Sequence, residues 1–480
     1  MNEPGDPRLP STTDGVAVGQ RRRARGAVVA VALATAMAAT AVAGDAGHGD
    51  PQRGFELLRT KAYLPADFDQ EVFDQLWTTW EEPLRSRAEA APLAERRRMA
   101  MERYGLVADP ADASRSLQYV VDDRGLWTMS CLACHQGQVD GRAIAGVPNS
   151  DYALETLTEE VRQVKIATRK PLAHMDLGSL LIPLGTTAGT TNAVVFGVAL
   201  MRHRDADLNL VPAPPQLSYP HHDMDAPAWW HYSRRRQLYA DAFAPKGHRV
   251  LMQFLLVKEN GPGQFAAWEE DYRHVEAWLE SLEPPSWPWS VDTALAARGR
   301  GLYAAHCAEC HGAPSRDRSV ADGYPERVVP LDEIGTDPVR FAALSAEQRR
   351  SLAGSWFGRG VPAPRPGSDE PAGYVAPPLD GIWASAPYLH NGSVPTLWHL
   401  LRPAARPVVW RRDGQARYDR DRVGLVVEEL PALAAGALPA VERRRHFDTT
   451  RPGKSAAGHD FPDVLDEEGK TAVLEYLKTL

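Results

Sequence analysis

The four cysteines of this 480-residue chain form two pairs, and a histidine follows each pair at once. The two segments read Cys131-Leu-Ala-Cys134-His135 and Cys307-Ala-Glu-Cys310-His311. In such a C-x-x-C-H pattern, the two thiols add to the vinyl groups of a haem and the histidine binds its iron. A four-cysteine zinc site or a thioredoxin-like pair is an alternative, but neither requires a histidine after both pairs. The sequence therefore predicts two covalently bound haem c groups, with His135 and His311 as iron ligands.

The second axial position of each iron decides between electron transfer and binding of O2 or peroxide. The last methionine is Met252, so the second haem cannot take a methionine from its own half of the chain. The histidines that follow its motif are His390, His399, His446 and His459. His459 lies just before a predicted C-terminal helix, where small cytochromes place this ligand, but a single histidine is more often a surface or hydrogen-bonded residue, so position alone leaves the choice open.

The sequence alone does not decide which residue is the second ligand of the first haem. The candidates are His174, His203, His221, His222, His231, His248, Met175 and Met224. The basic cluster Arg234–Arg236 either neutralises haem propionates or forms a solvated helix face.

Helices must position these motifs. Apolar residues at helical spacing between Phe68 and Trp80 predict a helix with Asp67 as its N-cap, and a second helix covers Trp268 to Trp278. A helix over 294–305 leads into Cys307, and another covers 465–480. The Pro- and Trp-rich segment 284–289 separates a domain at 50–285 from one at 286–480. We expect a mainly α fold of two cytochrome c-like haem domains with long irregular loops and little sheet.

The N-terminus has the features of an export signal. Basic residues 21–25 precede an uncharged Ala- and Val-rich run, 27–43, which ends in the small-residue pattern Ala41-Val-Ala43. This pattern favours a cleaved signal peptide at 1–43 over a retained membrane anchor. We therefore expect a periplasmic or secreted protein with no membrane span after cleavage. The net charge of −8 argues against a nucleic-acid partner.

Three segments resemble di-haem cytochromes of the bacterial cytochrome c peroxidase superfamily, in the branch that contains the latex-cleaving rubber oxygenase. They are Leu379-Asp-Gly-Ile-Trp-Ala-Ser-Ala-Pro-Tyr-Leu-His390-Asn-Gly-Ser-Val-Pro395, Gly458-His459-Asp460-Phe461 and Met224-Asp-Ala-Pro-Ala-Trp-Trp230. The resemblance covers most of the chain after the signal, and the segment around His390 is its most specific part. It implies two haem domains that face each other, a reactive N-terminal haem and a C-terminal haem with two histidine ligands.

The resemblance also implies roles for single residues. His459 becomes the second ligand of the second haem, and His390 becomes an interface or propionate-binding residue rather than a ligand. Trp230 and Phe243 resemble aromatic residues over the open face of the reactive haem, although packing between helices would also explain them. Relatives often carry a basic residue near Pro377, which this chain lacks, so the propionate contact is either absent or supplied elsewhere, for example by Arg402 or Arg406. The resemblance further allows a calcium ion at the domain interface, for which the sequence names no ligands.

Two function classes follow. In the first, the protein is an oxidoreductase whose N-terminal haem reacts with peroxide or with O2 and an apolar substrate, while the second haem exchanges electrons with a redox partner protein. In the second, both irons have two ligands and the protein is a non-catalytic electron carrier. A structural or sensory role is a third, weaker reading. The sequence contains no nucleophile elbow, P-loop, zinc-protease or dinucleotide-binding motif.

Overall fold

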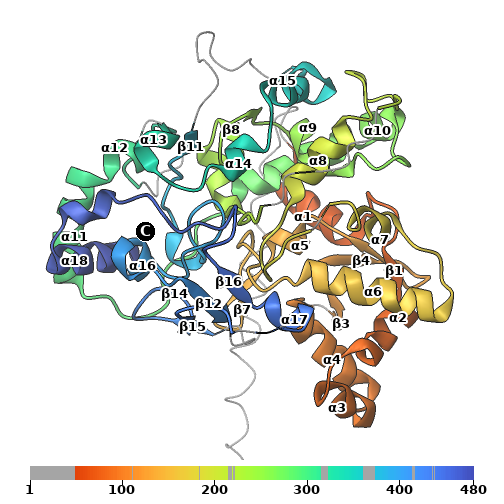
Figure 1. Cartoon of the computed structure of the whole chain (residues 1–480). Coiled ribbons are helices and arrows are strands. Elements are labelled where there is room, and N and C mark those ends of the chain that lie inside the picture. The colour runs from red at the N-terminus through yellow and green to blue at the C-terminus, as the bar shows by residue number, and fades with distance from the viewer. Residues whose placement is uncertain are drawn as a thin grey trace, which may run out of the picture. The chain divides into compact units, whose positions relative to one another are not determined.

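Each C-x-x-C-H motif lies beside a pair of packed helices in the computed structural model, as Figure 1 shows for α11 (Thr293–His306) and α18 (Glu467–Leu477). The structure describes residues 49–480 except 111, 183, 214–218, 220, 221, 315–322, 361–372, 413–416, 435 and 437. The predicted signal peptide and the candidate ligand His221 lie outside the described residues. None of the described helices is long and apolar enough to span a membrane.

Helices form most of the regular structure. Those before residue 285 are α1 (Pro51–Thr60), α2 (Gln70–Gln75), α3 (Leu84–Ala90), α4 (Leu93–Tyr104), α5 (Leu132–His135), α6 (Leu154–Thr168), α7 (His174–Gly178), α8 (Ala193–Met201), α9 (His248–Leu251) and α10 (Pro262–Ser281). Those after it are α11 (Thr293–His306), α12 (Ala308–His311), α13 (Leu331–Ile334), α14 (Val339–Ala342), α15 (Ala346–Gly354), α16 (Leu397–Leu400), α17 (Ala440–Arg443) and α18 (Glu467–Leu477). The short 3₁₀ helices η1 (Leu76–Thr79) and η2 (Trp229–Arg234) also bear on the site.

The strands of the described residues are short and pair antiparallel. One three-stranded sheet has the order β1 (Phe68–Asp69), β5 (Leu126–Met129), β4 (Tyr119–Val121), and another has β15 (Val427–Leu430), β12 (Val409–Arg412), β16 (His446–Asp448). The two-stranded pairs are β2 (Ala108–Asp109) with β3 (Asp112–Ser116), β6 (Gln138–Val139) with β7 (Arg142–Ala143), β8 (Gln237–Leu238) with β9 (Ala244–Pro245), β10 (Val328–Pro330) with β11 (Gly373–Val375), and β13 (Tyr418–Asp419) with β14 (Gly424–Leu425).

The predicted helices over 268–278, 294–305 and 465–480 are confirmed as α10, α11 and α18. The helix predicted to begin at Asp67 starts later, at Gln70, with Asp69 as the N-cap that accepts from the Val72 amide. Asp67 was therefore the wrong N-cap. Its carboxylate instead accepts a hydrogen bond from the Met129 amide at the end of β5, so it serves the strand that leads into the first motif.

A close helix crossing supports the second motif. The Cβ that Gly299 of α11 lacks would lie 1.9 Å from the carbonyl oxygen of Ala472 in α18. Only glycine allows the two backbones to approach this closely. The buried side chains Tyr303, Val473 and Leu477 fill the space beside this crossing. The crossing fixes the direction in which α11 delivers Cys307.

Asp380 joins the half of the chain that carries the first motif to the half that carries the second. Its backbone carbonyl accepts from Trp230 Nε1 at 2.7 Å and from His231 Nε2 at 2.8 Å, and its carboxylate pairs with Arg234. Glu326 binds Arg235 at 2.9 Å and Arg236 at 3.1 Å. The basic cluster Arg234–Arg236 therefore bridges the two halves through carboxylates of the C-terminal half.

Gly381 lies at this junction, where both its backbone conformation and the space around it favour glycine. Its φ is +65°, and an added Cβ would lie 2.9 Å from Trp230 Nε1 and 2.9 Å from Pro285 Cδ. We expect Gly381→Ala to lower the free energy of unfolding by about 2–5 kcal/mol, because left-handed strain and overpacking add. Denaturant unfolding of the purified protein measures this.

The matched control is Gly141→Ala. Gly141 has φ +74°, but an added Cβ would meet no atom of the described residues within 4 Å. Gly141→Ala should lower the free energy of unfolding only by the cost of the left-handed conformation, about 1–2 kcal/mol. Equal losses in the two variants would show that the contact of Gly381 with Trp230 is unimportant.

Candidate haem sites

The two motif histidines have the same hydrogen-bond arrangement. Nδ1 of His135, at the end of α5, lies 3.2 Å from the carbonyl oxygen of Pro227, and Nδ1 of His311, at the end of α12, lies 2.8 Å from that of Pro377. A carbonyl only accepts, so each Nδ1 carries the proton and each Nε2 keeps its lone pair. Burial lowers the pKa of His135 to about 4 and also lowers that of His311. Both imidazoles are therefore neutral and oriented as metal ligands.

The motif cysteines form no disulfide with one another and line one cavity. Its volume is about 1240 Å³, and Cys131, Cys134, Cys307 and Cys310 all lie on its wall together with both motif histidines. Pockets for single small molecules usually measure about 300–1,000 Å³. The cavity is therefore large enough for a bulky prosthetic group at each motif.

The cysteine environment differs from that of a zinc or thioredoxin-like site. Burial raises the pKa of Cys134 to about 12 and that of Cys307 to about 11, so neither is a reactive thiolate at neutral pH. Among the described residues, no three His, Cys, Asp or Glu side chains gather into a group that could hold a metal ion. Free thiols, an oriented histidine and a large cavity suit haem c at each motif.

His459 lies opposite His311. The ring centres are 6.2 Å apart, and both side chains line the cavity. Two imidazoles that bind one iron from opposite sides, with bonds of about 2 Å, have ring centres about 6 Å apart. Burial lowers the pKa of His459 to about 3, so this ring too is neutral. The spacing fits the predicted role of His459 as the second ligand of the second haem.

Arg406 holds the loop that carries His459. Its Nη1 donates to the carbonyl oxygens of Ala456 and Gly458, both at 2.6 Å, and Nη2 donates to that of His459 at 3.4 Å. Arg402 instead pairs with Glu467 at 2.8 Å. These two side chains, which the sequence suggested for haem propionates, are thus bound to the chain itself in the structure.

We expect Arg406→Gln to loosen His459 without removing it. Each buried carbonyl left without a donor costs about 1–3 kcal/mol, so thermal unfolding should occur several degrees lower, and part of the low-spin signal of the second haem should be lost on warming. Temperature-dependent absorption spectra of the ferric protein measure this. Arg298→Gln, which breaks an exposed pair with Glu468 at 3.1 Å, is the control and should change neither property. An unchanged spectrum in Arg406→Gln would contradict the positioning role.

Trp229, rather than Trp230, contacts the first motif histidine. The indole of Trp229 stacks on His135 with ring centres 4.2 Å apart and an interplanar angle of 14°. Trp230 is buried against Asp380, and Phe243 stacks on Tyr239 at 4.5 Å. Among the described residues, the cavity wall includes Trp229 and Tyr239 but neither Trp230 nor Phe243. The structure thus places the two predicted aromatic residues one layer behind the cavity, and no sequence pattern predicted the stacking of Trp229 on His135.

His390 lies between the loops that hold the two motif histidines. Its backbone carbonyl accepts from the Asp225 amide at 3.0 Å, two residues before Pro227. Its ring stacks on Tyr374, with centres 4.1 Å apart, three residues before Pro377. It lines the cavity, where burial lowers its pKa to about 3. Its position between the two loops agrees with the role of an interface residue.

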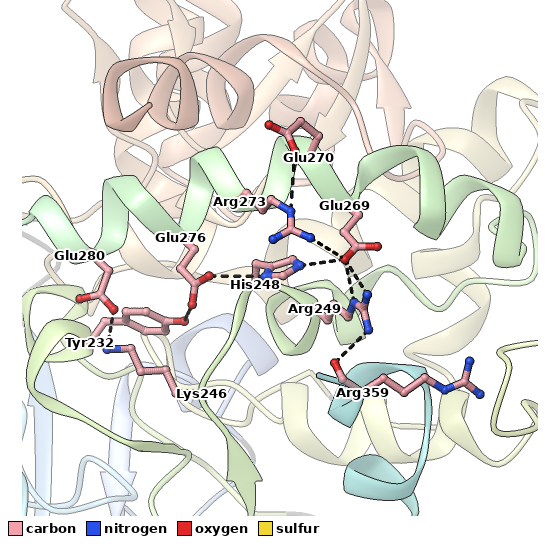
Figure 2. A network of polar contacts seen from close by, with 10 residues as sticks. All are labelled: Tyr232, Lys246, His248, Arg249, Glu269, Glu270, Arg273, Glu276, Glu280 and Arg359. Carbon is pink, nitrogen blue, oxygen red and sulfur yellow. Dashed lines mark hydrogen bonds and ion pairs between the residues drawn. The ribbon is translucent and has the colours of Figure 1, made fainter. Parts of the chain in front are cut away.

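The structure narrows the candidates for the second ligand of the first haem. His248 has a carboxylate at each ring nitrogen, Glu269 at 3.2 Å and Glu276 at 3.5 Å (Figure 2). His231 donates to Asp380, and His203 is exposed. His222 is buried but does not contribute to the described cavity wall. The candidates on the described cavity wall are His174, Met175, Met224 and His231. Of these, His231 already donates from Nε2 to the Asp380 carbonyl.

The polar network of Figure 2 also supports the first site. Tyr232 of η2 donates to Glu276 of α10 at 2.8 Å, and Lys246 lies 4.6 Å from the centre of its ring. Tyr272 of α10 lies 4.0 Å from the Cys131 sulfur. The network therefore holds the segment with Trp229 and the helix beside Cys131 in a fixed relation.

Comparisons with known proteins agree with a cytochrome. Residues 373–411 match a family described as "RoxA-like, cytochrome c-like". This confirms the predicted resemblance at the level of a RoxA-like cytochrome c domain, and such a domain implies covalently bound haem c. The matched residues include Pro377, Asp380 and His390.

Two curated relatives come from Sinorhizobium fredii (strain NBRC 101917 / NGR234). The uncharacterized protein y4iJ is 33% identical over 269 residues, which cover 43% of this chain and 43% of that protein. The uncharacterized protein y4iM is 36% identical over 226 residues, which cover 42% of this chain and 49% of that protein. The chain spans less than half the length of each relative, and their names state no activity.

Proposed function

We propose that the chain is an exported oxidoreductase of the di-haem cytochrome c peroxidase superfamily, with one haem c at each C-x-x-C-H motif. The first haem would react with peroxide or O2, and the second would exchange electrons with a redox partner protein. The observation that carries this proposal is an asymmetry between two otherwise matching sites. Both motif histidines donate to a proline carbonyl, but within the part of the chain that the structure describes a histidine ring contact is seen only for His311, whose ring centre lies 6.2 Å from that of His459.

The asymmetry assigns different tasks to the two sites. Bound haem c supplies an iron that gains and loses single electrons and binds small ligands where an axial position is free. His311 and His459 would occupy both axial positions at the second motif, which suits electron transfer. At the first motif, His135 would hold the haem with the indole of Trp229 stacked on its ring, and we infer that peroxide or O2 would bind at this haem.

Contacts between the two halves of the chain would keep the two haem sites at a fixed distance from each other. The loops that accept from His135 and His311 are joined by the backbone bond from Asp225 to His390 and by the stacking of His390 on Tyr374. The carboxylate of Asp380 with Arg234, and that of Glu326 with Arg235 and Arg236, add charged contacts across the same junction. A fixed distance between electron donor and acceptor is what repeated electron transfer requires.

Oxygenation of an apolar substrate is the second candidate. Leu177 lines the cavity and is 53% exposed, and Leu180 and Leu181, which follow it in the chain, are 62% and 77% exposed. Exposed apolar residues beside a cavity indicate a contact with an apolar molecule. They favour a substrate of that kind without excluding peroxide.

Turnover assays on the purified holoprotein test the proposal. We expect either consumption of hydrogen peroxide with a reduced one-electron donor, or O2 uptake with an apolar polyene. Activity with peroxide alone would select the peroxidase reading, and activity with the polyene alone would select the oxygenase reading. Reduction and reoxidation of both haems without either activity would contradict the proposal and leave an electron carrier.

A further inference from the structure

A buried carboxylate, Asp67, and an imidazole, His174, lie close together on segments near the first motif. His174, the first residue of α7, lines the cavity. Asp67 is 6% exposed, and its Oδ2 accepts from the amide of Met129 at 2.8 Å, two residues before Cys131. Met175, next to His174, packs against the same apolar cluster as Cys134. His174 therefore lies on the cavity wall, with Asp67 next to it, on segments that pack with the first motif.

The two side chains face each other but leave polar atoms unsatisfied. His174 Nε2 lies 3.7 Å from Asp67 Oδ1. Asp67 Oδ1 and His174 Nδ1 are buried and have no hydrogen-bond partner among the described residues. More than about 90% of buried polar groups are hydrogen-bonded, so two neighbouring exceptions call for an explanation. Polar groups that are poorly paired without substrate and tighten when it binds are typical of catalytic sites.

The nearby cationic side chains bind groups other than the Asp67 carboxylate, so this carboxylate can interact with His174. Lys165 binds the carboxylate of Asp176 and donates to the backbone carbonyl of Asp67, not to its carboxylate. Arg162 donates to the carbonyl of Asp176 and to Ser179. The Lys165 charge is thus matched by Asp176. Burial raises the pKa of Asp67, while nearby His174 and Lys165 lower it, so a cation on His174 would favour the charged carboxylate.

We propose that His174 and Asp67 form a proton-accepting pair for weak acids that bind at the first haem, hydrogen peroxide among them. This inference deepens the proposed function and rests on a free axial position at that haem. As a weak acid HX binds, its proton passes to His174 and X⁻ donates its electron pair to the iron. No electrons are transferred, and the positive charge gained by the imidazole is balanced by Asp67. An acid–base pair of this kind is needed for peroxide but not for the oxygenation of an apolar molecule.

Cyanide binding tests the pair without any turnover. Hydrogen cyanide is protonated at neutral pH and must lose its proton on binding to ferric haem, whereas CO binds to ferrous haem without proton transfer. In stopped-flow measurements on the holoprotein, His174→Leu should slow cyanide association about 100-fold, in the range found for acid–base groups. Asp67→Asn, which keeps an oxygen for the Met129 amide, should slow it less. CO binding should be unchanged in both.

The control is His203→Leu, the same substitution at an exposed histidine, which should alter neither ligand. Unchanged cyanide association in His174→Leu, with CO binding intact, would overturn the pair alone. Failure of the unmodified protein to bind either ligand would overturn the proposed free position and the pair with it. CO binding that appears only after His174→Leu would show that His174 is an iron ligand, which also overturns both.

Discussion

Replacing His459 with alanine should raise CO binding by the reduced protein from one molecule per chain to two. His459 is the histidine that faces His311, with ring centres 6.2 Å apart. Without it, the second iron would keep His311, held by the Pro377 carbonyl, and would lose its other strong ligand. An iron with one protein ligand binds CO and becomes high-spin in the ferric state.

Titration with CO, followed by absorption spectra, measures this prediction. The control is His446→Ala, because His446 is a buried histidine whose Nδ1 lies 2.9 Å from the Glu442 carbonyl oxygen and which does not line the cavity. That variant should still bind one CO. If His459→Ala also bound one CO and kept the low-spin ferric spectrum, His459 would not be the second ligand.

Preventing haem attachment should prevent folding of the chain rather than give a stable empty protein. A cavity of about 1240 Å³ leaves the apolar side chains around it without packing partners, and voids of this kind destabilise a folded protein. Folded proteins are stable by only about 5–15 kcal/mol, so little of this loss can be tolerated. The haem groups are therefore expected to form part of the protein core.

The experiment compares the unmodified chain with Cys131→Ser/Cys134→Ser and with Cys307→Ser/Cys310→Ser. Each variant should lose one covalently bound haem by mass, and limited proteolysis should cut it at least 10-fold faster than the holoprotein. The exposed-pair variant Arg298→Gln again serves as the control, because it leaves both motifs intact. A variant that carries one haem and resists proteolysis as well as the holoprotein would show that the cavity does not depend on its contents.

Most features that depend on residues close together in the sequence could be predicted. The two C-x-x-C-H motifs, the helices α10, α11 and α18, and the proximity of His459 to His311 follow from residue type and position along the chain. Asp67 was misplaced as a helix cap because Asp69 offers the same carboxylate two residues later. Both residues satisfy the capping pattern, and only pairing with β5 decides between them.

Contacts between residues far apart in the sequence could not be predicted from the sequence pattern. The carbonyls of Pro227 and Pro377 lie 92 and 66 residues from the histidines that they orient, and a backbone carbonyl leaves no signature in residue type. The adjacent tryptophans Trp229 and Trp230 show the same limit. One stacks on His135 and the other donates to Asp380, and only the turn of η2 determines which side chain faces which partner.

The most direct test of the asymmetry between the two sites is low-temperature EPR of the ferric holoprotein as isolated, with both signals integrated. We predict one high-spin and one low-spin haem in equal amounts, with CO binding after reduction limited to a single haem. Two low-spin signals, with no CO binding before or after half-reduction, would contradict the account and identify the protein as an electron carrier.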